Sequence, residues 1–267
     1  MDLPGILLLL AAGGAAGFLA GFFGVGGGIL LVPVLLFYFA SAGVSPDVAT
    51  HMALGTSLLI VIFASLSSAV RYTQNGYVVW RAVGFIGAAS VAGAWAGSRA
   101  AGMLEGDTLR QIFAGVVLLA SGRLLVEREG APREEKPNPH AGGLVATGLA
   151  TGAVSSLAGV GGGVFSIPIM YHFLGFPLKK ALGTSSATIV LTAMAAGAGY
   201  VLNGWGNPLL PPRTLGYVDW LSALPVIAGT LPAARYGATV AHRTKSDILR
   251  KIYAVFLLVI AFRMFFF

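Results

Sequence analysis

Long apolar stretches, separated by short polar or glycine-rich breaks, run through almost all of the 267 residues. Apolar stretches of about 18 or more residues are typical of membrane-spanning helices. One charged, proline-rich segment, residues 127–139, divides the stretches into two groups, and we expect it to be exposed to solvent. The predicted helical segments are 5–23, 29–42, 48–70, 78–99 and 109–126 before it, and 140–158, 164–176, 180–202, 218–238 and 248–267 after it.

The two groups of segments repeat each other. The string GVGGG occurs at Gly24–Gly28 and again at Gly159–Gly163, and a proline follows each copy five residues later. A second string, LGTS, occurs at 54–57 and at 182–185. Hydrophobic halves interrupted by glycine and proline at matching places are typical of transporters. We therefore predict a first transmembrane repeat (1–126), a cytoplasmic linker (127–139) and a second transmembrane repeat (140–267).

The number of membrane segments depends on whether 5–42 and 140–176 each form one span or two. One span each gives eight segments, four plus four, with the halves pointing the same way. Two each gives ten segments, five plus five, with the halves inverted. Cytoplasmic loops of membrane proteins are enriched in lysine and arginine. The ten-segment topology puts 13 of the 17 Lys and Arg residues on one face, whereas the eight-segment topology splits them 8 against 9. We therefore predict an all-α integral membrane protein with an inverted internal repeat and both termini outside.

Composition supports this class. Hydrophobic residues make up 56% of the chain and charged residues 10%, with a mean hydropathy of +0.82. Soluble domains carry about 25% charged residues. The net charge of +7 comes from scattered loop cations, so nucleic acid is not an expected partner. The chain has no cysteine, no cluster of metal ligands and no nucleophile motif, so we expect no metal, no cofactor and no enzyme activity.

The glycine strings are the strongest candidates for a binding site. The predicted segments 29–42 and 164–176 are shorter than the roughly 30 Å apolar core of a bilayer, so the strings must dip into it. Irregular backbone at that depth must line a cavity or be buried in protein. Glycine exposes backbone N–H groups, and a helix N-terminus attracts anions. Close helix packing is the alternative explanation. The predicted substrate-binding glycines are Gly24, Gly26, Gly27 and Gly28, and Gly159, Gly161, Gly162 and Gly163.

Hydroxyl groups of the repeated LGTS strings are the next candidates. Thr56, Ser57, Thr184 and Ser185 could donate hydrogen bonds to substrate oxygens, or could bond to carbonyls of their own helix. His51 lies one helical turn before Gly55 and is a candidate for proton coupling, although the second half has no matching histidine. Arg71 is a candidate for an anion entrance. Carboxylates are absent from the middle of every predicted span, which favours an anionic or neutral substrate.

The chain resembles the sulfite exporter TauE/SafE family, also called the toluenesulfonate uptake permease family. The resemblance rests on AGFFGVGGGILLVPVL at 20–35, ALGTS at 53–57, AGVGGGVFSIPIM at 158–170 and ALGTSSATI at 181–189, and it covers essentially the whole chain. Members of that family are inner-membrane proteins linked to the movement of sulfite, sulfonates, sulfoacetate and other sulfur-containing anions. The family is commonly described as two four-helix halves, which differs from our charge count.

The resemblance implies a secondary transporter of a small sulfur-containing anion in the inner membrane, with export favoured over import. Its expected partners are this small anion and the lipid bilayer. An anion channel that uses the same loops, or an uptake permease for another organic anion, is the alternative. The sequence does not select the compound, the coupling ion or the oligomeric state.

Overall fold

The structure is a computed structural model of the chain. The structure describes residues 3–109, 111–112, 114–115, 139–212, 214–244 and 255. Most of the predicted segments 109–126 and 248–267, and the predicted linker except for residue 139, lie outside the described residues.

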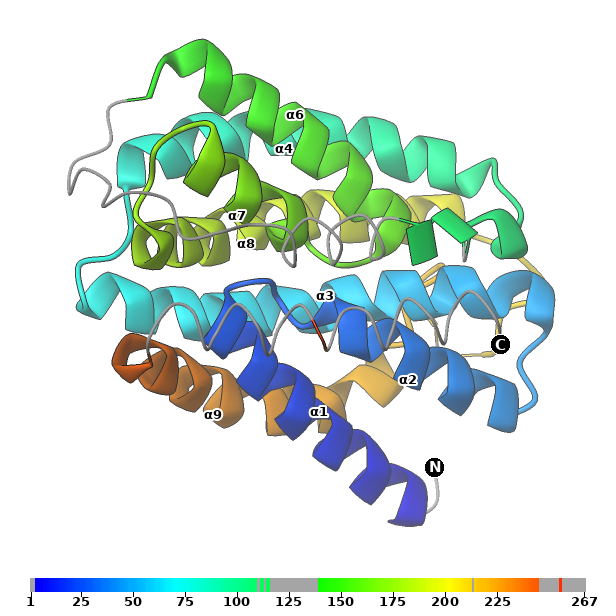
Figure 1. Cartoon of the computed structure of the whole chain (residues 1–267). Helices are drawn as coiled ribbons and strands as arrows, with labels where there is room; N and C mark the ends of the chain where they lie inside the picture. Colours follow the sequence, from blue (N-terminus) through cyan, green and yellow to red (C-terminus); the bar gives the residue numbers. More distant parts are fainter. Residues whose placement is uncertain are drawn as a thin grey trace.

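The described part of the chain is an all-helical bundle (Figure 1). Every predicted segment within the described ranges is confirmed as a helix, with ends that shift by a few residues. The helix α7 ends earlier than predicted, because Gly175 has a φ of +71° and Pro177 follows. The helices are α1 (Leu3–Phe23), α2 (Gly28–Ser41), α3 (Pro46–Gln74), α4 (Trp80–Gly102), α6 (Ala141–Ala158), α7 (Gly163–His172), α8 (Leu178–Asn203) and α9 (Trp220–Arg243).

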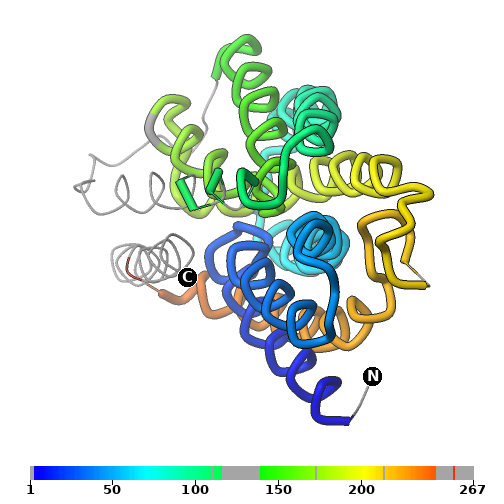
Figure 2. Tube along the Cα trace, turned by 90° about the vertical axis from the view of Figure 1, so that its right-hand side faces the viewer, coloured from blue at the N-terminus to red at the C-terminus, as the bar shows by residue number. Residues whose placement is uncertain are grey.

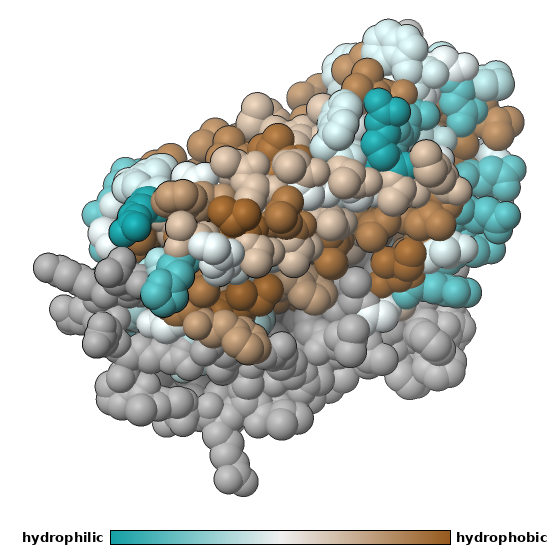
Figure 3. All heavy atoms as spheres, turned by 90° about the horizontal axis from the view of Figure 1, so that it is seen from above, coloured by the Kyte–Doolittle hydropathy of each residue, from teal (hydrophilic) through white to brown (hydrophobic). Residues whose placement is uncertain are grey.

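Four of the described helices, α1, α3, α6 and α8, are long and apolar enough to cross a membrane. The helices α2 and α7 have only 14 and 10 residues. At 1.5 Å per residue, these give about 21 Å and 15 Å, so neither helix can span a bilayer alone. Figure 3 shows an apolar band of side chains with hydrophilic residues gathered toward each end. The protein is therefore a multi-pass membrane protein in which two short helices begin at buried glycines inside the bundle.

The long helices α3 and α8 lie side by side in the middle of the bundle (Figures 1 and 2). Around them, α1 packs along α9, and α4 packs along α6. Small residues make both outer pairs close: a Cβ atom at Gly13 or Gly17 would collide with the α9 backbone, and one at Gly148 or Gly152 with the α4 backbone. Such small-residue contacts are a common way for helices to associate in membranes.

The two ends of the bundle carry opposite charge among the described residues. One end, here the basic end, holds six cations and no described carboxylate. The other, here the acidic end, holds four carboxylates and a single described cation, Arg99. The cations of the basic end are Arg71, Arg81, Lys179, Lys180, Arg235 and Arg243, and the carboxylates of the acidic end are Asp47, Glu105, Asp107 and Asp219.

Contacts between helix ends fix this grouping. At the basic end, Arg71 Nε donates to Thr239 Oγ1 at 3.0 Å, and Lys179 Nζ donates to the carbonyl of His242 at 2.8 Å. The eight-segment topology would put Arg71 and Lys179 on opposite faces of the membrane, whereas the ten-segment topology puts them together. The described helices therefore run as the ten-segment topology requires. The total count stays a prediction, because two of the ten segments lie mostly outside the described residues.

A labelling experiment tests this topology. The chain has no native cysteine, so single cysteines can be introduced at Gln74, Lys180 and Asp107. In intact cells, a membrane-impermeant maleimide should label the Asp107→Cys variant alone, and permeabilised cells should allow labelling of all three. Labelling of Gln74→Cys and Lys180→Cys from opposite sides would contradict the topology.

Candidate functional site

Two glycine loops, residues 24–27 between α1 and α2 and residues 159–162 between α6 and α7, have nearly the same backbone conformation. Their glycines take φ values of +65°, +82° and +79° at Gly24, Gly26 and Gly27, and of +64°, +85° and +88° at the matching positions of the second loop. Residues with a side chain are strained in this left-handed region, so glycine is required there. Each loop ends at the first residue of a short helix, Gly28 of α2 or Gly163 of α7.

The loops lie against each other inside the bundle. A Cβ atom on Gly28 would lie 2.6 Å from the carbonyl oxygen of Gly159, and one on Gly163 would lie 2.8 Å from that of Gly24. The start of each short helix therefore touches the loop of the other half. All glycines of both loops are buried.

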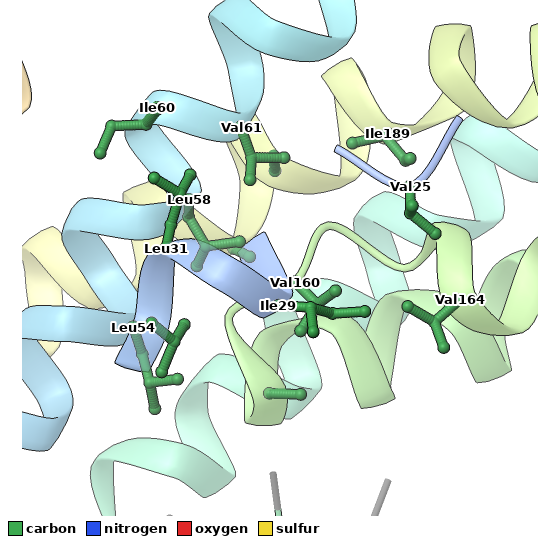
Figure 4. Packing of buried hydrophobic residues seen from close by; sticks show 14 of the residues in the cluster. Val25, Ile29, Leu31, Leu54, Leu58, Ile60, Val61, Val160, Val164 and Ile189 are labelled. Atoms are coloured by element: carbon green, nitrogen blue, oxygen red, sulfur yellow. The ribbon is translucent and has the colours of Figure 1, made fainter. Parts of the chain in front are cut away.

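The tips of the loops meet at one residue from each central helix. Cβ atoms on Gly26 and Gly161 would lie 2.8 Å and 2.7 Å from the same Val61 methyl group. Both would also contact Ile189 of α8, at 3.4 Å and 2.7 Å. Figure 4 shows Val61 and Ile189 projecting toward the loops from α3 and α8. The described packing leaves little room between the tips, so a ligand that binds between them must move them apart.

One carbonyl of each loop is held by a serine from the opposite half of the chain. Ser57 Oγ on α3 donates to the carbonyl of Gly159 at 2.6 Å, and Ser185 Oγ on α8 donates to that of Gly24 at 3.1 Å. Ser185 also shares a 2.9 Å hydroxyl contact with Ser166 of α7. Both hydroxyl protons are therefore used within the protein in this arrangement. The predicted contact of Ser57 and Ser185 with a substrate stays a prediction.

Three backbone amides at the end of each loop lack partners, whereas the N–H groups of Gly24 and Val160 bond carbonyls of the preceding helices. Among the described residues, none accepts a hydrogen bond from the N–H of Gly26, Gly27 or Gly28, and the same holds for Gly161, Gly162 and Gly163. No side chain caps α2 or α7. Each loop therefore presents buried donors next to the partial positive charge of a helix N-terminus. This arrangement suits an anion.

The predicted threonines hold connecting segments. Thr56 Oγ1 accepts a hydrogen bond from the backbone N–H of Asp219 at 3.0 Å, and Thr184 Oγ1 accepts one from that of Val79 at 3.1 Å. Both threonine side chains are fully buried. They bind the segments that lead into α9 and α4, on either side of the glycine loops. Whether they also bind a substrate stays a prediction.

His51 and Arg71 lie at opposite ends of α3, away from the loop tips. The buried imidazole of His51 stacks on Tyr217, with ring centroids 4.8 Å apart, and its Nε2 lies 3.2 Å from the carbonyl oxygen of Ala101. Its Nδ1 has no partner among the described residues. Arg71, half-buried at the basic end, bonds Thr239 and Gln74. The structure brings the loop glycines together with Ser57 and Ser185. His51 and Arg71 lie away from that group.

Two buried hydroxyls near the loops were not found from the sequence. Ser65 Oγ on α3 would lie 3.2 Å from a Cβ atom on Gly26, and the Cβ of Ser155 on α6 would lie 3.3 Å from one on Gly162. Neither hydroxyl has a hydrogen-bond partner among the described residues. The repeat points only to positions that match between the halves, and the positions that match Ser65 and Ser155 hold Ala193 and Ala20.

The buried surroundings of the loops are uncharged in the described part of the chain. Its buried side chains include no Asp, Glu, Lys or Arg. Within the same residues, no group of three or more His, Cys, Asp or Glu side chains could hold a metal ion. Among the described residues, the groups near the loops that attract an anion are dipoles, namely backbone amides, helix N-termini and hydroxyls.

Removing the serine bonds should destabilise the protein. Ser57→Ala and Ser185→Ala each leave a buried carbonyl of the opposite half unpaired, at a cost of about 1–3 kcal/mol. We expect both variants to melt several degrees lower in detergent. Ser186→Ala is the matched control, because the Ser186 hydroxyl bonds only the Leu182 carbonyl of its own helix. Equal melting of all three variants would show that the serine bonds do not hold the halves together.

Comparison with known proteins agrees with this description. Residues 9–264 match the family described as "Sulfite exporter TauE/SafE". A "Probable membrane transporter protein" of Haemophilus influenzae is 33% identical over 97% of this chain and 98% of its own length. Proteins with similar names from Methanocaldococcus jannaschii and Bacillus subtilis are 28% and 26% identical, over 91% and 89% of both chains in each pair. No solved structure matches. The chain therefore belongs to the TauE/SafE family of membrane transporters.

Proposed function

We propose that this protein is a secondary transporter that exports a small sulfur-containing anion of the sulfite, sulfonate or sulfoacetate class across the inner membrane. The observation that carries the proposal is the pair of buried glycine loops with unpaired N–H groups where each short helix begins. Buried N–H donors at a helix N-terminus favour negatively charged oxygens. The description of the matched family supports the choice of sulfite chemistry and of export.

The proposed substrate lies between the two loops, near the middle of the membrane. Its oxygens accept hydrogen bonds from N–H groups of Gly26, Gly27 and Gly28 and of the matching Gly161, Gly162 and Gly163. The predicted contacts of Gly24, Gly159 and the four hydroxyls of Thr56, Ser57, Thr184 and Ser185 belong to the same proposal. An inside-negative membrane potential favours the exit of an anion by about 2.3 kcal/mol per charge per 100 mV.

We also propose that the halves form an inverted repeat, so that rocking of one half against the other opens the site to each side in turn. Matching contacts support this proposal. Ser57 and Ser185, Thr56 and Thr184, and Gly28 and Gly163 each make the same kind of contact with the opposite half. Tyr72 and Tyr200 are a further matched pair, whose hydroxyls donate within their own halves to the carbonyls of Gly21 on α1 and Ser156 on α6.

A matched pair of glycine variants tests the proposed site. Gly162→Ala and Gly175→Ala both put a side chain at a left-handed position, with φ values of +88° and +71°. A Cβ atom at Gly175 would meet open space, outside the loops, whereas Gly162 lies in the second loop. In proteoliposomes, we expect Gly175→Ala to keep counterflow of radiolabelled sulfite or taurine and Gly162→Ala to lose it. Equal transport by both variants would refute the loop assignment, and large unitary currents would favour a channel.

Proton coupling through His51 is a separate proposal. If His51 carries the coupling proton, His51→Gln should keep sulfite counterflow, which needs no net proton movement, but lose sulfite-driven alkalinisation or acidification of the vesicle interior. His140→Gln, at the exposed start of α6, is the control and should keep both. Unchanged proton movement in His51→Gln would exclude this role. Arg71 stays our candidate for an anion entrance at the basic end.

A further inference from the structure

Ser65 and Ser155 differ from neighbouring serines on the helices that carry them. A serine or threonine inside a helix normally donates to a carbonyl three or four residues earlier. On α3, Ser68 donates to the Ser65 carbonyl at 3.1 Å, and on α6, Ser156 donates to that of Gly152 at 2.8 Å. Ser65 and Ser155 make no such bond, and theirs are the unpaired buried hydroxyls among the described residues.

Burial makes these two free hydroxyls costly to keep. Ser65 and Ser155 are only 0% and 1% exposed. A buried hydroxyl without a partner destabilises the folded state, and alanine at the same position would remove that cost. Alanine does occupy the matching positions of the opposite halves, Ala193 and Ala20. At each of these two positions of the repeat, one half therefore has an apolar side chain, whereas the other half has a buried hydroxyl.

Their position connects both hydroxyls to the glycine loops. Ser65 lies one helical turn after Val61 and shares the face of α3 that meets the loop tips. Ser155 lies one turn after Thr151, whose carbonyl oxygen would be 3.1 Å from a Cβ atom on Gly162. Each loop with unpaired amides thus has an unpaired hydroxyl beside it, and the two come from different helices, α3 and α6.

We propose that Ser65 and Ser155 are ligand-binding residues, whose hydroxyls donate to oxygens of the small oxyanion held between the glycine loops. This inference rests on the proposed function. The pair does not follow the symmetry of the repeat, since Ser65 is on the third helix of the first half and Ser155 on the first helix of the second. The oxyanion therefore meets different groups on its two sides, which favours a single bound orientation.

Alanine variants of the full-length protein test the proposal through two readouts, the affinity for sulfite and the melting temperature without sulfite. Ser65→Ala and Ser155→Ala should each weaken sulfite binding about 10- to 100-fold, as expected for a lost hydrogen bond to a charged group. The same variants should melt at the same or a higher temperature without sulfite, because an unpaired buried hydroxyl is gone. A residue with a purely structural role would not give opposite changes.

Matched controls are available on the same helices. Ser68→Ala and Ser156→Ala remove hydroxyls that bond their own helix, and should keep the sulfite affinity within about twofold of the unaltered protein. Wild-type affinity in Ser65→Ala and Ser155→Ala would overturn the inference, and so would a loss of affinity that accompanies a lower melting temperature. If the unaltered protein binds neither sulfite nor a sulfonate, the proposed function itself fails. This result differs from failure of the serine inference alone, in which the unaltered protein still binds sulfite.

Discussion

Backbone polar groups buried at membrane depth need partners, and the two glycine loops satisfy this requirement only in part. Water is absent from the apolar core of a bilayer, so an unpaired N–H or C=O is costly there. Ser57 and Ser185 provide partners for the carbonyls of Gly159 and Gly24. No described group does the same for the N–H groups at the start of α2 and α7. The serine bonds and the packing of the surrounding helices hold these N–H donors close together.

Close packing of small residues makes this possible. Glycines along α1 and α6 let these helices approach α9 and α4 until backbone meets backbone. At the loop tips, glycines leave space for the side chains of Val61 and Ile189. A bundle packed in this way is stiff, so the halves are expected to move as units. The serine bonds connect the halves at the loops, and any motion that opens the site must break or rearrange at least one of them.

Sequence patterns predicted much of this. Apolar length and the breaks at Gly24–Gly28 and Gly159–Gly163 placed the described helices within a few residues, because lipid imposes a simple pattern on the chain. The repeat also singled out the glycine loops and the LGTS strings, and the structure brings the loops together with Ser57 and Ser185. It could not give the partner of each hydroxyl, which depends on approach across the bundle: Thr56 binds the segment before α9 rather than its own helix. Ser65 and Ser155 were not predicted because the matching positions of the repeat do not carry hydroxyls. A hydroxyl that does not bond its own helix is recognised only in the three-dimensional structure.

The claim that the loop amides bind an oxyanion can be tested at the atoms concerned. The sequence contains only three Val-Gly pairs, Val25-Gly26, Val160-Gly161 and Val83-Gly84. Protein labelled with ¹³C-carbonyl valine and ¹⁵N-glycine therefore gives three selected amide signals, with the exposed Gly84 of α4 as an internal control. Titration with sulfite or a sulfonate should move the Gly26 and Gly161 signals and leave that of Gly84 in place. Unmoved Gly26 and Gly161 signals at saturating ligand would contradict the account.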